Sequence, residues 1–209
     1  MLEAFSSRGG RAKYGGLPKR LLDIAIAASG LIISAPIMAL CAAAIWIDDG
    51  GPVIFRQSRV GAARRIFTCY KFRTMSNDAP HECATAKLDH AERYITRVGG
   101  LLRRTSLDEL PQLFNVLRGD MSLIGPRPVI PSERELVGLR DSLGVYGIRP
   151  GMTGLAQIRG RDVVTDRRKA AYDAQYMEHM SFGYDLVLLL QTLINVVMCR
   201  NVREGSQDA

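Results

Sequence analysis

IAIAASGLIISAPIMALCAAAIWI, residues 24–47, is the stretch that decides the architecture of this chain, because it contains no charged residue. A helix rises about 1.5 Å per residue, so this run would extend about 36 Å, enough to cross the hydrocarbon of a bilayer. Pro36 lies near the midpoint, where its ring removes one helical hydrogen bond, and Ser29 and Ser34 could satisfy the loosened backbone. The pattern predicts a membrane helix over residues 21–47 that is broken at Pro36, with Ser34 beside the break.

Basic residues flank the apolar run on both sides. A polar arm over residues 1–20 precedes it and contains Arg8, Arg11, Lys13, Lys19 and Arg20. The segment GPVIFRQSRVGAARRIFTCYKFR, just after the run, carries six more Lys or Arg. Because such residues favour the cytoplasmic side, both flanks are expected there, which suits a helix that enters the membrane and returns. Spanning helices also tolerate proline, so the pattern alone leaves a single spanning anchor open.

Length and charge limit the classes of protein. At 209 residues there is room for one domain and a membrane segment, but hardly for two cores. The net charge of +7 indicates an anionic partner: nucleic acid, a phosphorylated metabolite or acidic lipid. No aromatic stacking motif interleaves the basic residues, so we expect no nucleic-acid partner.

The remaining segments predict a mostly helical α+β domain over residues 48–199, followed by a tail over residues 200–209. Residues 50–75 alternate short β-prone runs with turn signals, as in a hairpin. Apolar residues recur at helical spacing until Gly119, and an extended loop rich in proline follows. Residues 165–180 resemble a polar helix. The last apolar segment, residues 186–198, is short and contains polar residues, so we expect a core or interfacial helix.

Asp108 and Glu109 adjoin each other in RRTSLDELPQLFNVLRGD, residues 103–120. A structural role is open to them, because Ser106 and Glu109 have the spacing of a capping box and acids in a first turn complement the helix dipole. Pro111 suits a first turn and indicates that the helix begins near Ser106. The acids are therefore expected at a helix N-terminus.

A helix N-terminus also attracts phosphate, so a chemical role is open as well. Neighbouring helical positions point about 100° apart, so the two acids cannot flank one glycosidic bond. Different roles fit better: one attacks phosphorus and the other holds a divalent cation. Cations on turns surround the pair in the sequence, and these are Lys71, Arg103, Arg104, Arg127 and Arg149.

The order of motifs resembles the monotopic phosphoglycosyl transferases, bacterial sugar transferases that act on polyprenol phosphate. The motifs are the apolar run with its proline, then GPVIFRQSRVG, YKFRTM, RRTSLDELPQLFNVLRGDMSLIGPRP, RPGMTGLAQIRGRD and SFGYDL. The resemblance implies transfer of a phospho-sugar from a UDP-sugar to undecaprenyl phosphate, with release of UMP. It places the enzyme in the bacterial inner membrane, at the cytoplasmic face among membrane lipids, and leaves open whether it forms a homo-oligomer.

The same resemblance assigns roles to individual residues. Asp108 matches the family's nucleophile, which forms a covalent phospho-sugar intermediate, and Glu109 matches the acid that binds Mg²⁺. Arg149 falls where the family contacts the nucleotide. Three cations match the family's phosphate-binding positions: Lys71, Arg103 and Arg127. The sugar is not identified, although GLAQIRGRD resembles members that use N-acetylated sugars.

Two other functions compete with this interpretation. One is metal-dependent hydrolysis of a nucleotide-linked diphosphate at the membrane, and the other is a basic membrane scaffold without chemistry. Release of UMP that depends on polyprenol phosphate distinguishes transfer from both.

Overall fold

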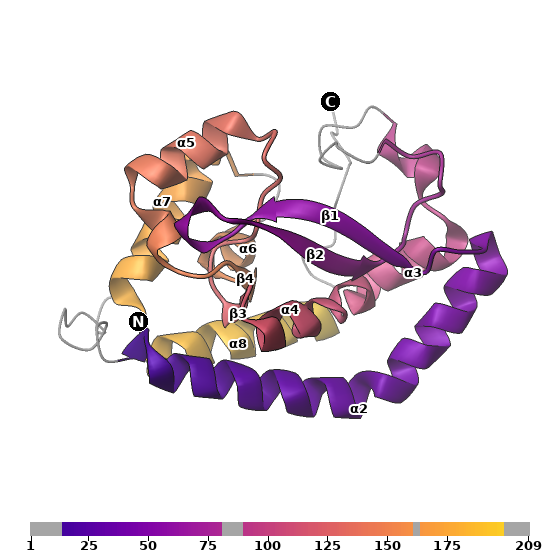
Figure 1. Ribbon diagram of the computed structural model, residues 1–209, viewed down its shortest axis with the longest axis horizontal. Helices are drawn as coiled ribbons and strands as arrows, with labels where there is room; N and C mark the ends of the chain where they lie inside the picture. The colour runs from indigo at the N-terminus through magenta and orange to yellow at the C-terminus, as the bar shows by residue number, and fades with distance from the viewer. Residues whose placement is uncertain (1–13, 81–89, 161–163, 199–209) are drawn as a thin grey trace.

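A computed structural model describes residues 14–80, 90–160 and 164–198 of the chain. Most of the arm predicted over residues 1–20 and all of the tail over 200–209 lie outside these residues. The described part is mostly helical, with two small two-stranded sheets, as the α+β prediction requires. Figure 1 shows the long helix α2, Leu17–Asp49, along one side of the molecule and the hairpin of β1 and β2 across the body above it.

Helix α2 contains the whole apolar run, with Pro36 inside it. The predicted break is not seen as an interruption, because the helix is continuous from Leu17 to Asp49. Figure 1 nevertheless shows the helix changing direction between its two halves. It is the only helix in the described part of the chain that is long and apolar enough to cross a membrane.

Both ends of α2 are bonded to the same folded body. Near its start, the Arg20 guanidinium donates to the carbonyls of Val116 and Leu117, at 2.6 and 2.8 Å. At its far end, Asp48 Oδ2 accepts from the Val98 backbone N–H at 3.0 Å. The Arg73 guanidinium also donates there, to the carbonyls of residues 49–51, at 2.7 to 3.1 Å. A bent helix fits this arrangement, because its two ends must return to one body.

The predicted hairpin is confirmed. Strands β1, Ile54–Val60, and β2, Ile66–Phe72, pair antiparallel from Ile54 opposite Phe72 to Val60 opposite Ile66. Alternation along a strand places every second side chain on the same face. Phe55, Gln57 and Arg59 of β1 therefore share a face with Cys69 and Lys71 of β2.

The segment with the two acids differs from the prediction. Helix α3, Arg97–Thr105, ends where Ser106 adopts a left-handed conformation with φ of 57°, and a 3₁₀ turn over Leu107–Glu109 follows. Helix α4, Gln112–Arg118, begins only after Pro111 and ends at Gly119. The prediction of a capping box is wrong, because the Ser106 side chain makes no capping hydrogen bond. Asp108 and Glu109 therefore lie in a turn between two helices, and not in the first turn of α4.

The loop predicted after Gly119 contains a strand. Strand β3, Ser122–Ile124, pairs in parallel with β4, Gly151–Thr153, which comes from the RPG motif. The backbones cross so closely that a Cβ on Gly151 would lie 2.1 Å from the Gly125 nitrogen. Only glycine fits at such a distance. The crossing explains why both the GPRP and RPG motifs contain glycine, and it anchors the loop that carries Arg127.

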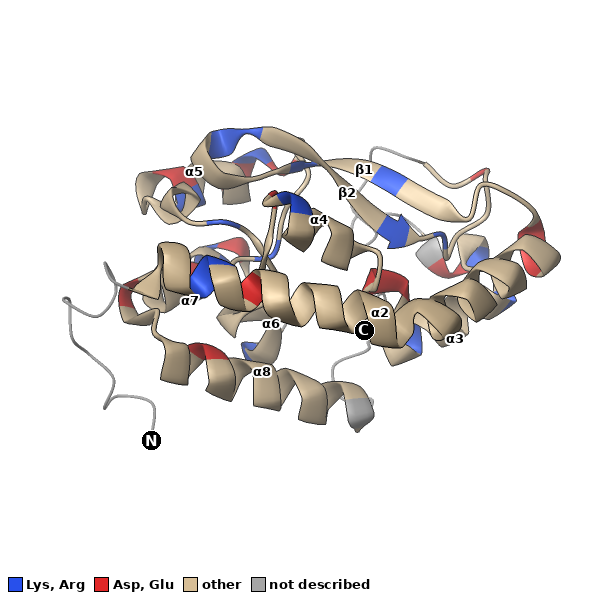
Figure 2. Ribbon diagram, turned by 60° about the horizontal axis from the view of Figure 1, so that its bottom comes forward, with Lys and Arg blue, Asp and Glu red and all other residues tan. Residues whose placement is uncertain are grey.

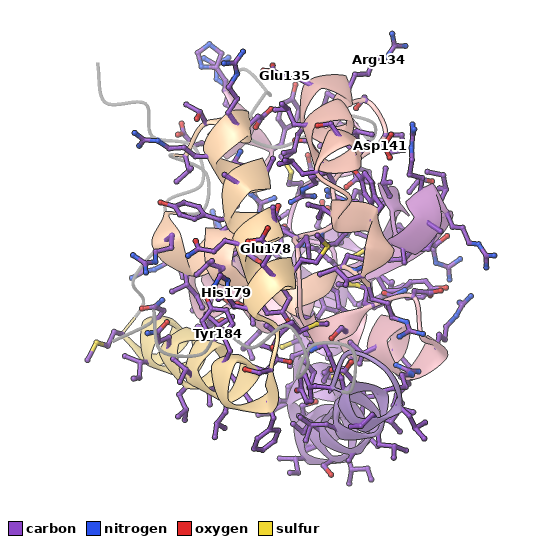
Figure 3. The ribbon with its side chains drawn as sticks, turned by 90° about the vertical axis from the view of Figure 1, so that its left-hand side faces the viewer. Arg134, Glu135, Asp141, Glu178, His179 and Tyr184 are labelled. Carbon is purple, nitrogen blue, oxygen red and sulfur yellow. The ribbon has the colours of Figure 1, made fainter. Side chains whose placement is uncertain are left out.

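Four further helices complete the domain: α5, Arg134–Ser142, α6, Leu155–Arg159, α7, Asp166–His179, and α8, Phe182–Val197. The last two confirm the helices predicted near the C-terminus. The main core lies between α2, β2, α4, β3 and α6 to α8, with Val116, Met121 and Leu188 fully buried. Figure 3 shows charged residues of α5, among them Arg134, Glu135 and Asp141, at the end of the body away from α2 and α8.

A buried polar network joins α2 to α8. The Asp185 carboxylate accepts hydrogen bonds from the Lys19 ammonium, the Tyr14 hydroxyl at 2.9 Å and the Tyr176 hydroxyl at 2.7 Å. Lys19 and Asp185 are 8% and 4% exposed. One turn further along α2, Asp23 accepts from the Leu123 backbone N–H at 3.0 Å. These contacts give a structural role to the aspartate of the SFGYDL motif.

We predict that Asp185→Ala destabilises the protein by about 3–5 kcal/mol, because it leaves the Lys19 ammonium buried without its carboxylate. Thermal unfolding in detergent, followed by circular dichroism, measures this loss. The control is Asp141→Ala, which removes a pair with Arg64 whose side chains are 47% and 58% exposed. The control is expected to change stability by less than about 1 kcal/mol. Equal losses in the two variants would contradict a stabilising role for the network.

Candidate active site

A pocket of about 740 Å³ lies under the hairpin, between β1, the segment after β2, the 3₁₀ turn and the loop after β3. Its lining includes Asp108 and three of the predicted phosphate-binding cations, Lys71, Arg103 and Arg127. These residues are up to 56 positions apart in the sequence, from 71 to 127. The fold therefore brings together side chains that lie far apart in the sequence.

The pocket is strongly cationic. Two carboxylates line it, those of Asp108 and Glu133. Eight Lys or Arg residues line it with them: Arg56, Arg59, Lys71, Arg73, Arg103, Arg127, Arg140 and Lys169. Such an excess of positive charge in a concave site attracts anionic ligands. Figure 2 shows Lys and Arg on the hairpin and on nearby segments, whereas most of α2 and α8 carries none.

Glu109 is the point where three segments meet. Its Oε1 accepts from Lys71 Nζ at 2.9 Å and from Arg127 Nη1 at 3.1 Å. The Glu109 side chain is 13% exposed, so both ion pairs are largely shielded from water. Glu109 therefore holds two cations that line the pocket, a role that the sequence did not reveal.

Asp108 is 8% exposed and lies beside this ion-pair cluster in the wall of the pocket. The short 3₁₀ turn gives adjacent residues different directions, so Asp108 lines the pocket while Glu109 binds the two cations. A carboxylate in a cationic, water-poor site is suited to attack an electrophilic phosphorus. The two acids therefore differ in orientation and partners, and their chemical roles stay predictions.

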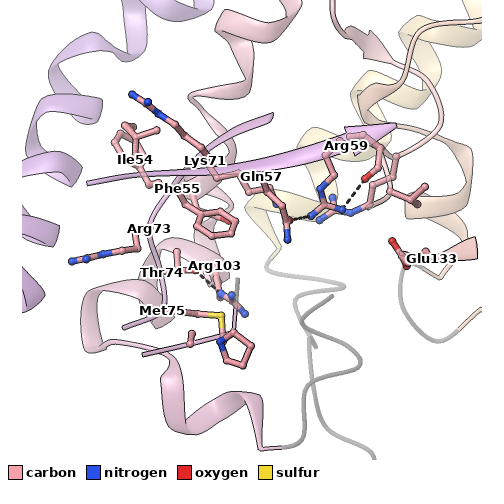
Figure 4. Close-up of a pocket in the computed structure, with 18 of the residues that line it drawn as sticks. Ile54, Phe55, Gln57, Arg59, Lys71, Arg73, Thr74, Met75, Arg103 and Glu133 are labelled. Carbon is pink, nitrogen blue, oxygen red and sulfur yellow. Dashed lines mark hydrogen bonds between the residues drawn. The ribbon is translucent and has the colours of Figure 1, made fainter. Parts of the chain in front are cut away.

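Arg103 reaches the site from the last turn of α3. Its Nε donates to Thr74 Oγ1 at 2.8 Å, a contact visible in Figure 4. Gly99 allows this approach, because a Cβ there would lie 2.1 Å from the Thr74 carbonyl oxygen. The YKFRTM motif therefore contributes Lys71 directly and positions Arg103 through Thr74.

Arg149 lies elsewhere. Its Nε donates to the Gly119 carbonyl at 2.9 Å, at the C-terminal end of α4, and it does not line the described pocket. Cations favour this position, because the last carbonyls of a helix carry partial negative charge. The prediction that Arg149 contacts the nucleotide has no support from this geometry.

Ser34 and Pro36 lie in α2, away from the pocket. The Ser34 hydroxyl donates to the Met38 sulfur at 3.5 Å, and not to a backbone carbonyl as expected. Any role of these two residues concerns the course of α2 and not the chemistry of the acids.

Sequence reasoning missed several residues of the pocket wall. Gln57 and Arg59 belong to the quoted motif GPVIFRQSRVG, and their i, i+2 spacing was the signal that they share a strand face with Lys71. Arg140 was not recognised either. Its Nε donates to Asp173 Oδ2 at 2.8 Å and its Nη1 to the Arg127 carbonyl at 2.8 Å, so it supports the Arg127 loop. No local pattern links these positions.

The acid pair is compatible with a divalent cation. Within the described ranges, no three Asp, Glu, His or Cys residues gather as they would in a site made of protein ligands alone. Mg²⁺ commonly binds through one or two carboxylates together with substrate phosphates. Glu109 is the acid predicted to hold the ion; its Oε1 is shared by Lys71 and Arg127, and Asp108 lines the pocket beside it.

A buried Asp108 in a cationic pocket, with Glu109 paired to two cations beside it and a helix of membrane-crossing length, is typical of an enzyme that acts on phosphate-bearing substrates. The family model for bacterial sugar transferases matches residues 14–199. The chain belongs to this family and is a phosphoglycosyl transferase, as the motifs predicted.

Curated relatives agree over most of the chain. The exopolysaccharide production protein ExoY of Rhizobium meliloti is 40% identical over 203 residues, covering 89% of this chain and 88% of the relative. A UDP-glucose:undecaprenyl-phosphate glucose-1-phosphate transferase of Caulobacter vibrioides is 40% identical, covering 88% of this chain and 72% of the relative. An undecaprenyl-phosphate galactose phosphotransferase of Salmonella typhimurium is 39% identical, covering 83% of this chain but 39% of the relative.

Proposed function

We propose that this enzyme transfers a sugar phosphate from a UDP-sugar to undecaprenyl phosphate through a covalent intermediate on Asp108. The observation that carries the proposal is the buried Asp108 in a pocket lined by eight cations, beside Glu109 bound to Lys71 and Arg127. The activities named for the Caulobacter and Salmonella relatives, both on undecaprenyl phosphate, support this acceptor. The Caulobacter relative is named as a transferase that uses UDP-glucose, which also supports a UDP-sugar donor.

The reaction proceeds in two displacements. A carboxylate oxygen of Asp108 attacks the sugar-linked phosphorus, the bond from this phosphorus to the bridging oxygen breaks, and UMP leaves with the electron pair. A phosphate oxygen of the lipid then attacks the same phosphorus, and the Asp108 carboxylate departs to regenerate the enzyme. Positive charge from Lys71, Arg103 and Arg127 stabilises the negative charge that accumulates on the phosphoryl oxygens in both steps.

Glu109, with Asp108 beside it, would hold Mg²⁺ when the donor binds. The ion would supply charge neutralisation for the diphosphate. Independently of the ion, Glu109 keeps the Lys71 and Arg127 side chains directed to the pocket.

The proposal includes a monotopic topology with the catalytic domain at the cytoplasmic face of the inner membrane. Support comes from the bonds that tie both ends of α2 to one body, since a straight span would place the ends on opposite sides. Further support comes from exposed apolar side chains on α2 and α8, which suit a lipid environment. They include Ile32, Ile33, Leu40 and Ile47 of α2 and Phe182, Leu190 and Leu193 of α8.

One incubation tests the activity. The purified protein is mixed with radiolabelled UDP-glucose, UDP-galactose or UDP-N-acetylglucosamine, with and without undecaprenyl phosphate and Mg²⁺. We expect a labelled lipid product and multiple turnovers of UMP release only with the lipid. Continuous UMP or sugar phosphate release without lipid would instead indicate hydrolysis, and the absence of both would favour a scaffold.

Cysteine labelling tests the topology. Single cysteines are introduced at Ser7, which lies outside the described residues, and at Ser58 on β1, after removal of the native cysteines. If α2 returns to its side of entry, both sites resist a membrane-impermeant thiol reagent in intact cells and react after lysis. Pro36→Ala restores a backbone donor and should expose the Ser7 site from outside in part of the population. Labelling of Ser7 from outside without that substitution would contradict the re-entrant helix and indicate a spanning anchor.

A further inference from the structure

Arg59 lines the pocket, but the proposed mechanism gives this arginine no role. It lies on the pocket-facing side of β1, between Gln57 and the end of the strand, opposite Phe67. Figure 4 shows it extending from β1 across the pocket wall, with Glu133 on the neighbouring loop. Nothing in the sequence motif assigns it a ligand.

The Arg59 guanidinium is held in one orientation by two acceptors. Nη1 donates to the Pro128 carbonyl at 3.0 Å, and Nη2 donates to Gln57 Oε1. A guanidinium has five N–H donors, so three remain for other partners. Pro128 belongs to the GPRP loop, so the same bond joins β1 to the loop that carries Arg127.

Charge around Arg59 is unbalanced. In the described part of the chain, no carboxylate forms an ion pair with it, whereas Lys71, Arg73, Arg127 and Arg140 each have one. Burial lowers the pKa of Arg59, and the nearby positive charge of Arg127 lowers it further. Glu133 and Glu109 oppose this effect, but Glu133 Oε2 accepts from the Ile130 backbone N–H at 3.1 Å and Glu109 Oε1 is shared by Lys71 and Arg127. A shielded guanidinium next to a second one is unfavourable unless an anion is bound between or beside them.

We propose that Arg59 and Arg127 together bind a phosphate group of a substrate, forming a second phosphate position beside the acid pair. Two oriented guanidinium groups match the tetrahedral oxygens of a phosphate through paired N–H···O bonds. Within the proposed function, that phosphate has two sources: the one that leaves with the nucleotide or the one that arrives on the lipid. Gln57 is then a positioning residue, which acts through Arg59.

Equilibrium binding of UMP and of uridine to the full-length protein in nanodiscs tests the proposed phosphate position of Arg59 and Arg127 without requiring catalysis. The difference between the two affinities isolates the contribution of the phosphate. If the position takes the nucleotide phosphate, Arg59→Gln weakens UMP binding about ten- to a hundredfold and leaves uridine binding unchanged. The matched control is Arg64→Gln, on the hairpin turn outside the pocket, which should bind UMP as the parent does.

The two half-reactions distinguish the sources. Intact-protein mass spectrometry follows adduct formation from the UDP-sugar, and discharge of the adduct by undecaprenyl phosphate is timed separately. A slow first step with weak UMP binding identifies the nucleotide phosphate, whereas a slow discharge with normal UMP binding identifies the lipid phosphate. Failure of the parent protein to form any adduct would refute the proposed function, while weaker UMP binding by Arg59→Gln would still show that Arg59 binds phosphate.

Two conservative variants guard against loss of folding. Arg59→Lys keeps the charge but loses the paired donors, so an intermediate effect is expected. Gln57→Glu gives Arg59 a carboxylate partner at the existing hydrogen bond and should weaken phosphate binding without removing the arginine. Normal UMP affinity and normal rates of both half-reactions in folded Arg59→Lys, Arg59→Gln and Gln57→Glu would overturn the proposal.

Discussion

Asp108→Asn is expected to abolish both the covalent phospho-sugar adduct and turnover, with a loss of at least about a thousandfold. Asparagine has nearly the same shape as aspartate, but its amide is a poor nucleophile and cannot form the acyl phosphate. Asp108 lines the pocket, so its carboxylate is in reach of a donor bound there. Intact-protein mass spectrometry after incubation with the UDP-sugar alone measures the adduct directly.

The matched control is Asp141→Asn, the same substitution at an exposed position on α5 that pairs with Arg64. It should form the adduct and turn over at the parent rate. A normal adduct on Asp108→Asn would show that another residue is the nucleophile, whatever the effect on turnover.

Glu109→Gln is expected to lower turnover by at least about a hundredfold and to make the remaining activity respond weakly to added Mg²⁺. The substitution removes a proposed metal ligand and also the charge that pairs with Lys71 and Arg127 through Oε1. The two cations would then repel each other without their shared anion. Initial rates over a series of Mg²⁺ concentrations measure both effects.

Glu135→Gln, at an exposed position in the first turn of α5, is the control and should keep the parent rate and Mg²⁺ response. Full activity of the parent protein in excess chelator would exclude the metal role. In that case a loss in Glu109→Gln would come from the ion pairs alone.

Local patterns were sufficient for several elements. Alternating β-prone residues around a turn indicated β1 and β2, and Gly119 with φ of 92° marked the end of α4 as expected. The charge-free run indicated α2, and no other helix among the described residues is long and apolar enough to cross a membrane. Such signals depend on residues close in sequence, which is why they can be read without a structure.

Local patterns failed where distant segments decide the conformation. The spacing of Ser106 and Glu109 fitted a capping box, but α3 ends at Ser106 and Glu109 is bound by Lys71 and Arg127, so a 3₁₀ turn replaces the cap. Strand β3 was missed because its partner β4 lies about 30 residues later. Arg149 binds the carbonyl of Gly119 at the end of α4, a contact that no local pattern indicated, and its role at the nucleotide stays a prediction.

By itself, the sequence determined the membrane-compatible helix, the hairpin, the family and the two adjacent acids, because each depends on the identity and order of nearby residues. The tertiary structure alone decided which cations meet these acids. Lys71 and Arg127 reach Glu109, whereas Arg59 joins Arg127 through the backbone of the GPRP loop. The physical reason is that ion pairs and close backbone crossings form between segments far apart in the chain, and only packing brings those segments together.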